Sequence, residues 1–217
     1  MEISVIIPAS NKNKYNLKGD LGDWGSTTLL EWKISQAKKI KRISDIYIST
    51  NDKEIIEIAK HYKLKFLNRN YKRSLSDLYK SSCQRVKSNY ILWLNCSFPF
   101  MSEKTINNFI DSFYKKRTKF DSAFMYYSDY EYFFMKKKPI NFDLNNMLVE
   151  RKNLTPLKKI IPGATIFQKK SILKNNCFGS KPFFKKINWL ESIELKNIKS
   201  YSEWFELSAL IANDNEK

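Results

Sequence analysis

Short apolar runs alternate with segments of helical spacing through the first half of the chain. The run ISVIIP at residues 3–8 is rich in β-branched residues and stops at a proline, which is typical of a buried strand. Apolar residues then recur at helical spacing from Thr28 to Ile40. The same alternation predicts strands at 45–50, 64–68 and 90–95, and helices at 52–61, 75–86 and 102–114. Strands separated by helices form a parallel sheet with right-handed crossovers, so we expect an α/β, Rossmann-like fold with a mostly parallel sheet flanked by helices.

The second half of the chain loses this alternation. Residues 121–135 are rich in strand-forming residues and are broken at Ser128 and Asp129, which predicts a strand and then a turn into a protruding hairpin. Residues 136–162 are polar and irregular. Beyond them the pattern predicts strands at 163–168 and 191–196 and a closing helix at 202–212.

Aromatic residues gather between Phe124 and Phe134. At strand spacing they fit either core packing or an interface, and stacking on bases is a further reading. A hairpin that leaves an α/β sheet often packs against a second subunit, so we favour an interface. We therefore expect a homodimer with a dimerisation subregion at about 126–160.

Length and composition favour one domain. At 217 residues and 42% hydrophobic composition, the chain is long enough for one sizeable core, and no linker interrupts it. We expect a single domain over 1–217. The three cysteines show no CxxC spacing, Glu2 stands where a signal peptide would be basic, and no apolar run reaches membrane-spanning length. These features favour a cytoplasmic protein that does not enter a membrane.

The chain is strongly basic, with 39 Lys and Arg against 22 Asp and Glu and a net charge of +17. Such a charge is compatible with a field that attracts nucleotides or polyanions. Only six of the cations are arginine, however, and the bidentate guanidinium is the group favoured in base and phosphate recognition. A solvated lysine surface is the simpler reading, and a nucleic-acid partner is not favoured.

Ligands of an open parallel sheet bind beyond the carboxyl ends of its strands, which here means the loops after Ile7, Ser49 and Leu94. The first loop, ASNKNKYNLKG, offers small residues and lysines that could hold phosphate, but it has neither a GxGxxG nor a P-loop pattern. The second loop, STND, is a ligand-facing turn or a helix cap. The third loop, NCSFPFMSE, holds either side chains that bind a base or a turn capped at Ser102.

Several segments together resemble, in order and over almost the whole chain, the CMP-sugar synthetases that activate sialic-acid-like and Kdo-type acids. They are IIPAS, NLKG, LLEWKISQA, DIYISTND, LWLNCSFPFMSE, FDSAFMYY, PGATIF and EWFELS. The resemblance implies a fold of the nucleotide-diphospho-sugar transferase type. It also implies CTP and a 2-keto sugar acid as substrates, Mg²⁺ as cofactor, pyrophosphate as product and a role in surface glycan biosynthesis.

The resemblance also assigns residues. It implies that Lys14 is catalytic and steadies the leaving pyrophosphate. The nucleotide-binding positions are Ala9, Ser10, Asn11, Lys14, Asn95 and Ser97. The substrate-binding positions are Thr50, Asp52, Arg69, Arg151, Asn153 and Gly163. If the last predicted strand aligns as SIELKN, Glu194 takes a metal position.

This sequence departs from the family pattern at charged positions. Ser10 replaces an arginine of the first loop, Met101 an arginine of the third loop, and Trp204 an aspartate of the closing helix. The two metal carboxylates of the family fall on Glu194 and Lys196, or on Ile198 and Ser200. Positioning and charge neutralisation supply most of the rate in phosphoryl chemistry. A cytidylyltransferase is therefore the first hypothesis, a non-catalytic homologue that keeps the fold is the second, and a basic nucleic-acid-binding module is a minor third.

Overall fold

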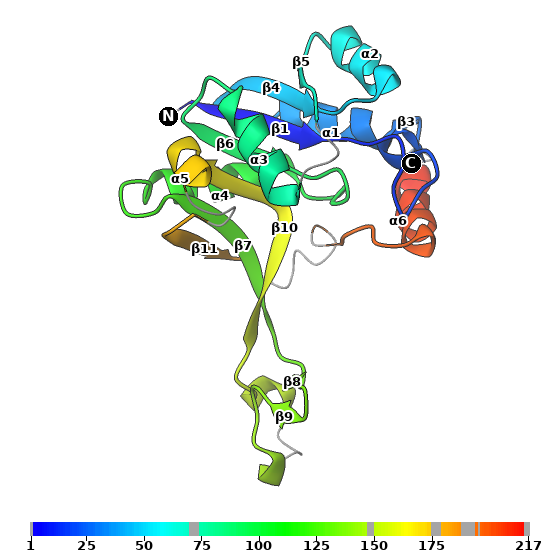
Figure 1. Ribbon diagram of the computed structural model, residues 1–217. Helices are drawn as coiled ribbons and strands as arrows, with labels where there is room; N and C mark the ends of the chain where they lie inside the picture. The colour runs from blue at the N-terminus through cyan, green and yellow to red at the C-terminus, as the bar shows by residue number, and fades with distance from the viewer. Residues whose placement is uncertain are drawn as a thin grey trace.

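The structure is a computed structural model that describes residues 2–69, 74–146, 150–174, 179–187, 194 and 196–214. Its centre is a seven-stranded sheet in the order β11-β7-β10-β6-β1-β4-β5 (Figure 1). The strands are β1 (Ile3–Pro8), β4 (Ile43–Ser49), β5 (Lys65–Leu67), β6 (Tyr90–Leu94), β7 (Ser122–Asp129), β10 (Leu157–Gln168) and β11 (Pro182–Lys186). β10 runs antiparallel to both of its neighbours, and all other pairs are parallel. The expected mostly parallel sheet is thereby confirmed.

Helices cover both faces of the sheet. They are α1 (Leu29–Lys38), α2 (Lys53–His61), α3 (Leu75–Gln84), α4 (Glu103–Tyr114), α5 (Lys169–Lys174) and α6 (Tyr201–Asp214). α1, α2, α4 and α6 pack in one core cluster with Val5 and Leu92, whereas α3 and α5 pack in the other with Ile6 and Trp93. Every residue from Ile3 to Ile7 is fully buried, because β1 is central and covered on both sides.

Side-chain caps set the starts of four helices. Thr28 forms a capping box with Glu31 at α1, and Ser74 forms one with Asp77 at α3. Asp52 accepts the N–H of Ile55 at α2, and Ser102 accepts that of Thr105 at α4. The helices expected at 28–40, 52–61, 75–86 and 102–114 are therefore confirmed to within a few residues.

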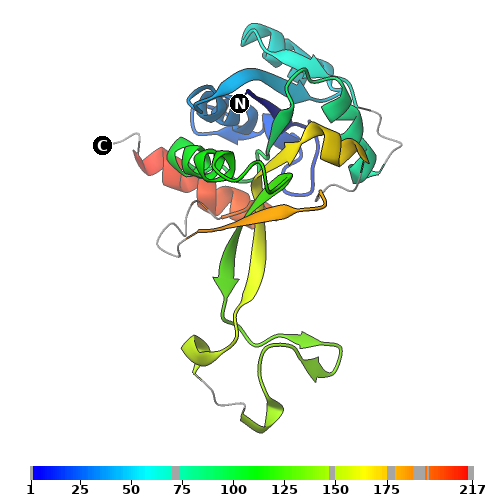
Figure 2. The ribbon, with the colours of Figure 1, turned by 90° about the vertical axis from the view of Figure 1, so that its left-hand side faces the viewer.

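An arm projects from the sheet, as Figures 1 and 2 show. β7 and β10 continue beyond the sheet as a pair, with Leu157 opposite Asp129 and Lys159 opposite Tyr127. At its far end are β8 (Phe134–Met135) and β9 (Lys138–Pro139), followed by the short turns η2 (Leu144–Asn146) and η3 (Arg151–Asn153). The protruding hairpin expected after residue 128 is thus present.

Three expectations for the second half of the chain either differ from the structure or concern residues that it does not describe. Residues 157–161 were expected to be irregular but belong to β10, because pairing with β7 supplies the order that their polar composition does not predict. β11 and α5 were not predicted, since both are short and lack a clear period. The strand expected at 191–196 lies almost wholly outside the described residues.

Small elements complete the chain around the first loop. η1 (Gly19–Leu21) is followed by a two-stranded ribbon of β2 (Asp23–Trp24) and β3 (Thr27–Thr28), which leads into α1. Among the helices in the described part of the chain, none is long and apolar enough to cross a bilayer.

Candidate functional site

The first loop folds around a buried carboxylate. The Ser10 N–H donates to Asp20 Oδ2 at 2.8 Å, and the Tyr15 hydroxyl donates to Asp20 Oδ1 at 3.0 Å. The Asp20 N–H in turn donates to the Ser10 carbonyl at 2.7 Å. Burial raises the pKa of Asp20 to about 6, although its hydrogen bonds and the nearby charge of Arg69 act in the opposite direction. The loop is therefore shaped by an internal anion.

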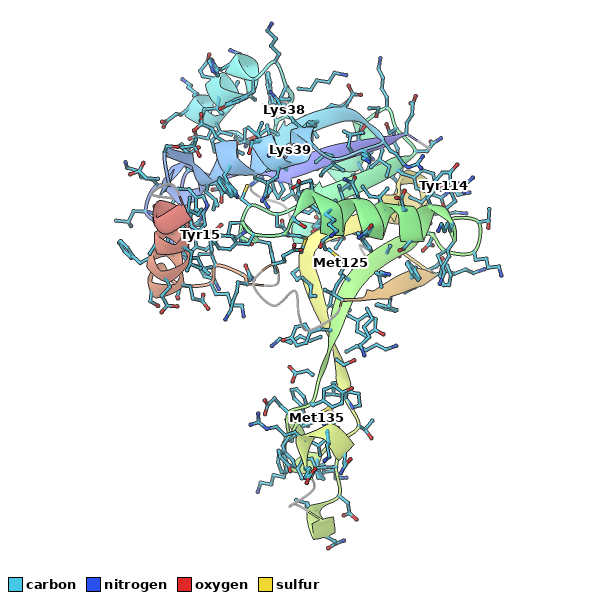
Figure 3. The ribbon with its side chains drawn as sticks, turned by 180° about the vertical axis from the view of Figure 1, so that it is seen from behind. Tyr15, Lys38, Lys39, Tyr114, Met125 and Met135 are labelled. Carbon is cyan, nitrogen blue, oxygen red and sulfur yellow. The ribbon has the colours of Figure 1, made fainter. Side chains whose placement is uncertain are left out.

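Aromatic side chains seat this loop against α6. The Tyr15 and Trp204 rings stack with centroids 6.0 Å apart, and Trp24 meets Trp204 edge-on at 5.2 Å. Figure 3 shows Tyr15 beside α6 on the body of the molecule, away from Met135 of the arm. Trp204, which replaces an acidic residue of the resembled family, is thus a packing residue and is only 4% exposed.

The polar groups of the second loop form hydrogen bonds within and next to the loop's own turn. The Thr50 hydroxyl accepts the Asp52 N–H at 3.1 Å, Thr50 is fully buried, and the Asp52 carboxylate caps α2. The Asn51 side chain pairs with the backbone of Arg69: its amide group donates to the Arg69 carbonyl, and its oxygen accepts the Arg69 N–H. The Arg69 Nε–H donates to Ser49 at 3.2 Å. Thr50 and Asp52 thus stabilise the turn of the second loop, whereas Arg69, which follows β5, brings a cation to the same edge of the sheet.

The third loop, residues 95–101, is tied to β10. The Asn95 N–H donates to the Gly163 carbonyl at 2.9 Å, and the Asn95 side-chain amide donates to the Pro162 carbonyl at 2.5 Å. A Cβ on Gly163 would lie 2.5 Å from the Met101 side chain and 2.8 Å from the Phe98 ring, so only glycine fits there. The structure thus brings together Asn95, an assigned nucleotide-binding residue, and Gly163, an assigned substrate-binding residue.

Three side chains of α1 hold the same loop from the other side. Lys33 Nζ donates to the Phe98 carbonyl at 2.7 Å and to Gln36 Oε1 at 2.6 Å. Trp32 Nε1 and Gln36 Nε2 both donate to the Pro99 carbonyl, at 2.8 and 2.6 Å. Lys33 is completely buried, and this burial lowers its pKa to about 8.

Two buried side-chain oxygens precede the residue that ties this segment to the third loop. The Ile198 N–H donates to the Ser97 carbonyl at 2.8 Å, which places this part of the chain at the sheet edge. Glu194 Oε2 and Asn197 Oδ1 are buried side-chain oxygens that find no hydrogen-bond partner among the described residues. Carboxylate and amide oxygens suit Mg²⁺, so these residues fit the implied metal. Among the described residues, no three His, Cys, Asp or Glu side chains gather at a common point.

Arg151 and Asn153 lie on the arm. Arg151 forms an ion pair with Glu131 at 3.0 Å and lines a cavity of about 400 Å³ with Tyr127 and Lys186. The extended strand from Leu157 to Gly163 alone spans about 20 Å. The chain therefore does not bring its own Arg151 and Asn153 beside Gly163.

Other assigned residues stand around the first loop. Ala9 is buried directly after β1, Ser10 is half-buried, and Asn11 and Lys14 are exposed. Ser97 is half-buried on the third loop. The carboxyl ends of β1, β5 and β6 thus gather Ala9, Ser10, Arg69, Asn95 and Ser97 at one edge of the sheet.

The sequence reasoning missed Asp20 and Lys33. A signal existed for Lys33, because it shares the helix face of Leu30, Ile34 and Ala37, where an apolar residue is expected. Asp20 carries no local signal, since its role depends on contacts with Ser10 and Tyr15.

An α/β sheet with a polar, partly cationic edge after its central strands is the arrangement in which proteins of the nucleotide-binding α/β class hold their ligands. The chain belongs to the cytidylyltransferase family: the model of the family described as "Cytidylyltransferase" matches residues 17–176. That match confirms the resemblance to the CMP-sugar synthetases at the level of the family. No curated protein matches the sequence.

Solved structures confirm the fold. CMP:2-keto-3-deoxy-manno-octonic acid synthetase complexed with CTP superimposes with a TM-score of 0.73 at 11% identity, over 99% of this chain and 100% of that chain. 4-Diphosphocytidyl-2C-methyl-D-erythritol synthase from Anaerococcus prevotii gives 0.69 at 15% identity, over 97% and 96% of the two chains. The expected fold of the nucleotide-diphospho-sugar transferase type is therefore confirmed.

Proposed function

We propose that the protein transfers the cytidylyl group of CTP to a 2-keto sugar acid of the sialic-acid or Kdo type. The observation that carries this proposal is the sheet edge that gathers Ser10, Arg69, Asn95 and Ser97 in a chain of the cytidylyltransferase family. The product would be a CMP-sugar for surface glycans, made in the cytoplasm where CTP is formed.

In the proposed reaction, a hydroxyl oxygen of the acceptor attacks the α-phosphorus of CTP. The bond from that phosphorus to the bridging oxygen breaks, pyrophosphate leaves, and the hydroxyl proton passes to solvent. Asn95 and Ser97 would locate the cytidine, and Lys14 and Arg69 would neutralise the phosphates. Mg²⁺, held by Glu194 and Asn197, would supply further charge neutralisation when bound.

The acceptor site requires a second copy of the chain. Arg151 and Asn153 stand on the arm, about 20 Å or more along the strand from Gly163. They could contact the acceptor only if the arm lies across the nucleotide site of another copy. We therefore include a homodimer in the proposal, with Arg151 as the cation that pairs with the acceptor carboxylate.

The test is thermal unfolding with CTP, UTP, ATP and GTP, each with and without Mg²⁺. A ligand at one hundred times its dissociation constant stabilises the native state by about 2.7 kcal/mol, or about 5–10 °C in a chain of this size. We expect such a shift for CTP with Mg²⁺, and a smaller Mg²⁺ effect in Glu194→Gln. Pyrophosphate release with a panel of 2-keto sugar acids then identifies the acceptor.

A second candidate is a non-catalytic homologue that still binds a nucleotide. The observation that favours it is Asp20, whose buried carboxylate already occupies the Ser10 N–H of the loop expected to hold phosphate. CTP binding without pyrophosphate release from any sugar acid would select this candidate. The absence of a shift with every nucleotide would overturn both.

A further inference from the structure

Lys33 places a positive charge beneath the third loop. Its side chain is 0% exposed, and its ammonium donates to the Phe98 carbonyl and to Gln36 Oε1. Within the described part of the chain, none of the ion pairs includes Lys33. A buried ammonium without a carboxylate partner opposes folding, so stability alone does not explain a lysine here.

The carbonyl groups that accept hydrogen bonds from Lys33 and its neighbours explain better why a lysine lies here. Trp32, Lys33 and Gln36 all donate to the carbonyls of Phe98 and Pro99, two consecutive residues of the third loop. The far side of that loop is fixed by β10 through Asn95 and by the Ile198 N–H at Ser97. The α1 contacts therefore complete a clamp around a loop of irregular backbone.

We propose that Lys33 is a positioning residue for the nucleotide, and that its ammonium holds the third loop in the conformation in which Asn95 and Ser97 receive the cytidine. This inference rests on the proposed function, since it assumes that the third loop binds the base. It does not require that the acceptor is a sugar acid. Preformed polar groups bind better than groups that must be ordered on binding, which is why an anchor on the loop affects affinity.

The experiment compares Lys33→Met with wild type and with Lys39→Met. Methionine keeps most of the lysine stem but cannot donate, and Lys39 is an exposed lysine at the end of α1 (Figure 3). Calorimetry measures the CTP dissociation constant, hydrogen exchange measures the amides of Phe98 and Met101 without nucleotide, and thermal unfolding monitors stability.

We expect Lys33→Met to raise the CTP dissociation constant at least about tenfold, which corresponds to about 1.4 kcal/mol. We also expect faster exchange at the loop amides and a melting temperature within about 3 °C of wild type, because removal of a buried charge offsets the hydrogen bond lost at the Phe98 carbonyl. Lys39→Met should match wild type in all three measurements.

A pH series separates positioning from packing. Burial lowers the pKa of Lys33 to about 8, and the titratable neighbour that acts on it is Cys96, whose pKa is raised by burial so that the thiol stays neutral. CTP affinity of wild type should therefore fall between pH 7 and pH 9, and that of Lys33→Met should not. Parallel pH profiles would overturn the proposal.

Two further outcomes are decisive. A folded Lys33→Met that binds CTP within twofold of wild type overturns the positioning role. If Lys33→Met does not fold, Trp32→Phe removes another donor of the clamp while keeping a ring, and unchanged CTP affinity and loop exchange in that variant overturn it. If wild type binds no CTP, the proposed function fails, and unchanged loop exchange in Lys33→Met would show that the anchoring fails as well.

Discussion

The pKa values of two buried aspartates of this protein, Asp20 and Asp121, are shifted in opposite directions. Burial dominates at Asp20 and raises its pKa to about 6. Burial also acts to raise the pKa of Asp121, but hydrogen bonds from Ser180, Lys181 and Ser171 outweigh it and lower the value to about 2. The number of donors around each carboxylate decides the sign. Asp121 ties the start of β7 to the turn before β11, whereas Asp20 shapes the loop of the candidate site.

The pKa of Asp20 predicts a gain of stability on mild acidification. Its value in the native state, about 6, lies above the ordinary 3.8, so the native state binds more protons than the unfolded state between those pH values. The free energy of unfolding should therefore rise by about 2 kcal/mol relative to Asp20→Asn as the pH falls from 6 to 4. Urea unfolding of both proteins across this range measures the difference.

Asp121 does not interfere with that measurement. Its stabilising contribution is present above pH 3.8 and is lost only as the pH falls toward 2, and it is shared by wild type and Asp20→Asn. Unfolding free energies of the two proteins that stay parallel between pH 6 and pH 4 would contradict the assignment to Asp20.

The arm exposes large apolar side chains of a kind that monomeric proteins usually bury. Tyr130, Phe134, Met135, Ile140 and Leu144 are all large, apolar or aromatic, and exposed. Met135 is 67% exposed and Ile140 is 48% exposed. Contiguous apolar surface of this kind marks interaction sites, and its position agrees with the dimerisation subregion that the sequence predicts.

We predict that the protein forms a homodimer through the arm and that Met135→Glu with Ile140→Glu makes it monomeric. Each lost apolar contact removes about 1.5–3 kcal/mol, so the dimer dissociation constant should rise by at least about a hundredfold. Sedimentation velocity over a concentration series measures this. Phe66→Glu, at a 40% exposed residue of the edge strand β5, is the control and should remain dimeric. Monomeric wild type would refute the prediction.

At the scale of the whole molecule, the net positive charge is the main electrostatic feature. A charge of +17 on 217 residues gives self-repulsion that destabilises the compact state. Ion pairs such as Arg42 with Asp111 and Lys60 with Glu57 are exposed and contribute little.

We predict that salt stabilises this protein. Raising NaCl from 20 to 200 mM shortens the Debye length and should raise the melting temperature by about 2–4 °C, the shift that about 1 kcal/mol produces in a chain of this size. Differential scanning fluorimetry provides the measurement. Sodium phosphate at equal ionic strength is the control, because a larger shift in phosphate indicates a bound anion rather than screening. A flat or falling melting temperature in NaCl would contradict the prediction.

The sequence by itself determined the βα alternation up to residue 114, the cap at Ser102, and the family. These features are local: strand and helix periods, capping residues and ordered motifs are all written within a few residues of one another.

Only the tertiary structure decided the rest. Residues 157–161 are a strand because β7 runs beside them, and β11 exists because it completes the edge next to β7. Asp20 and Lys33 acquire their roles from partners at Ser10 and Phe98, and Arg151 is carried away from Gly163 by the length of the arm. Long-range pairing and burial have no local period in the sequence, which is why they appear only when the chain is folded.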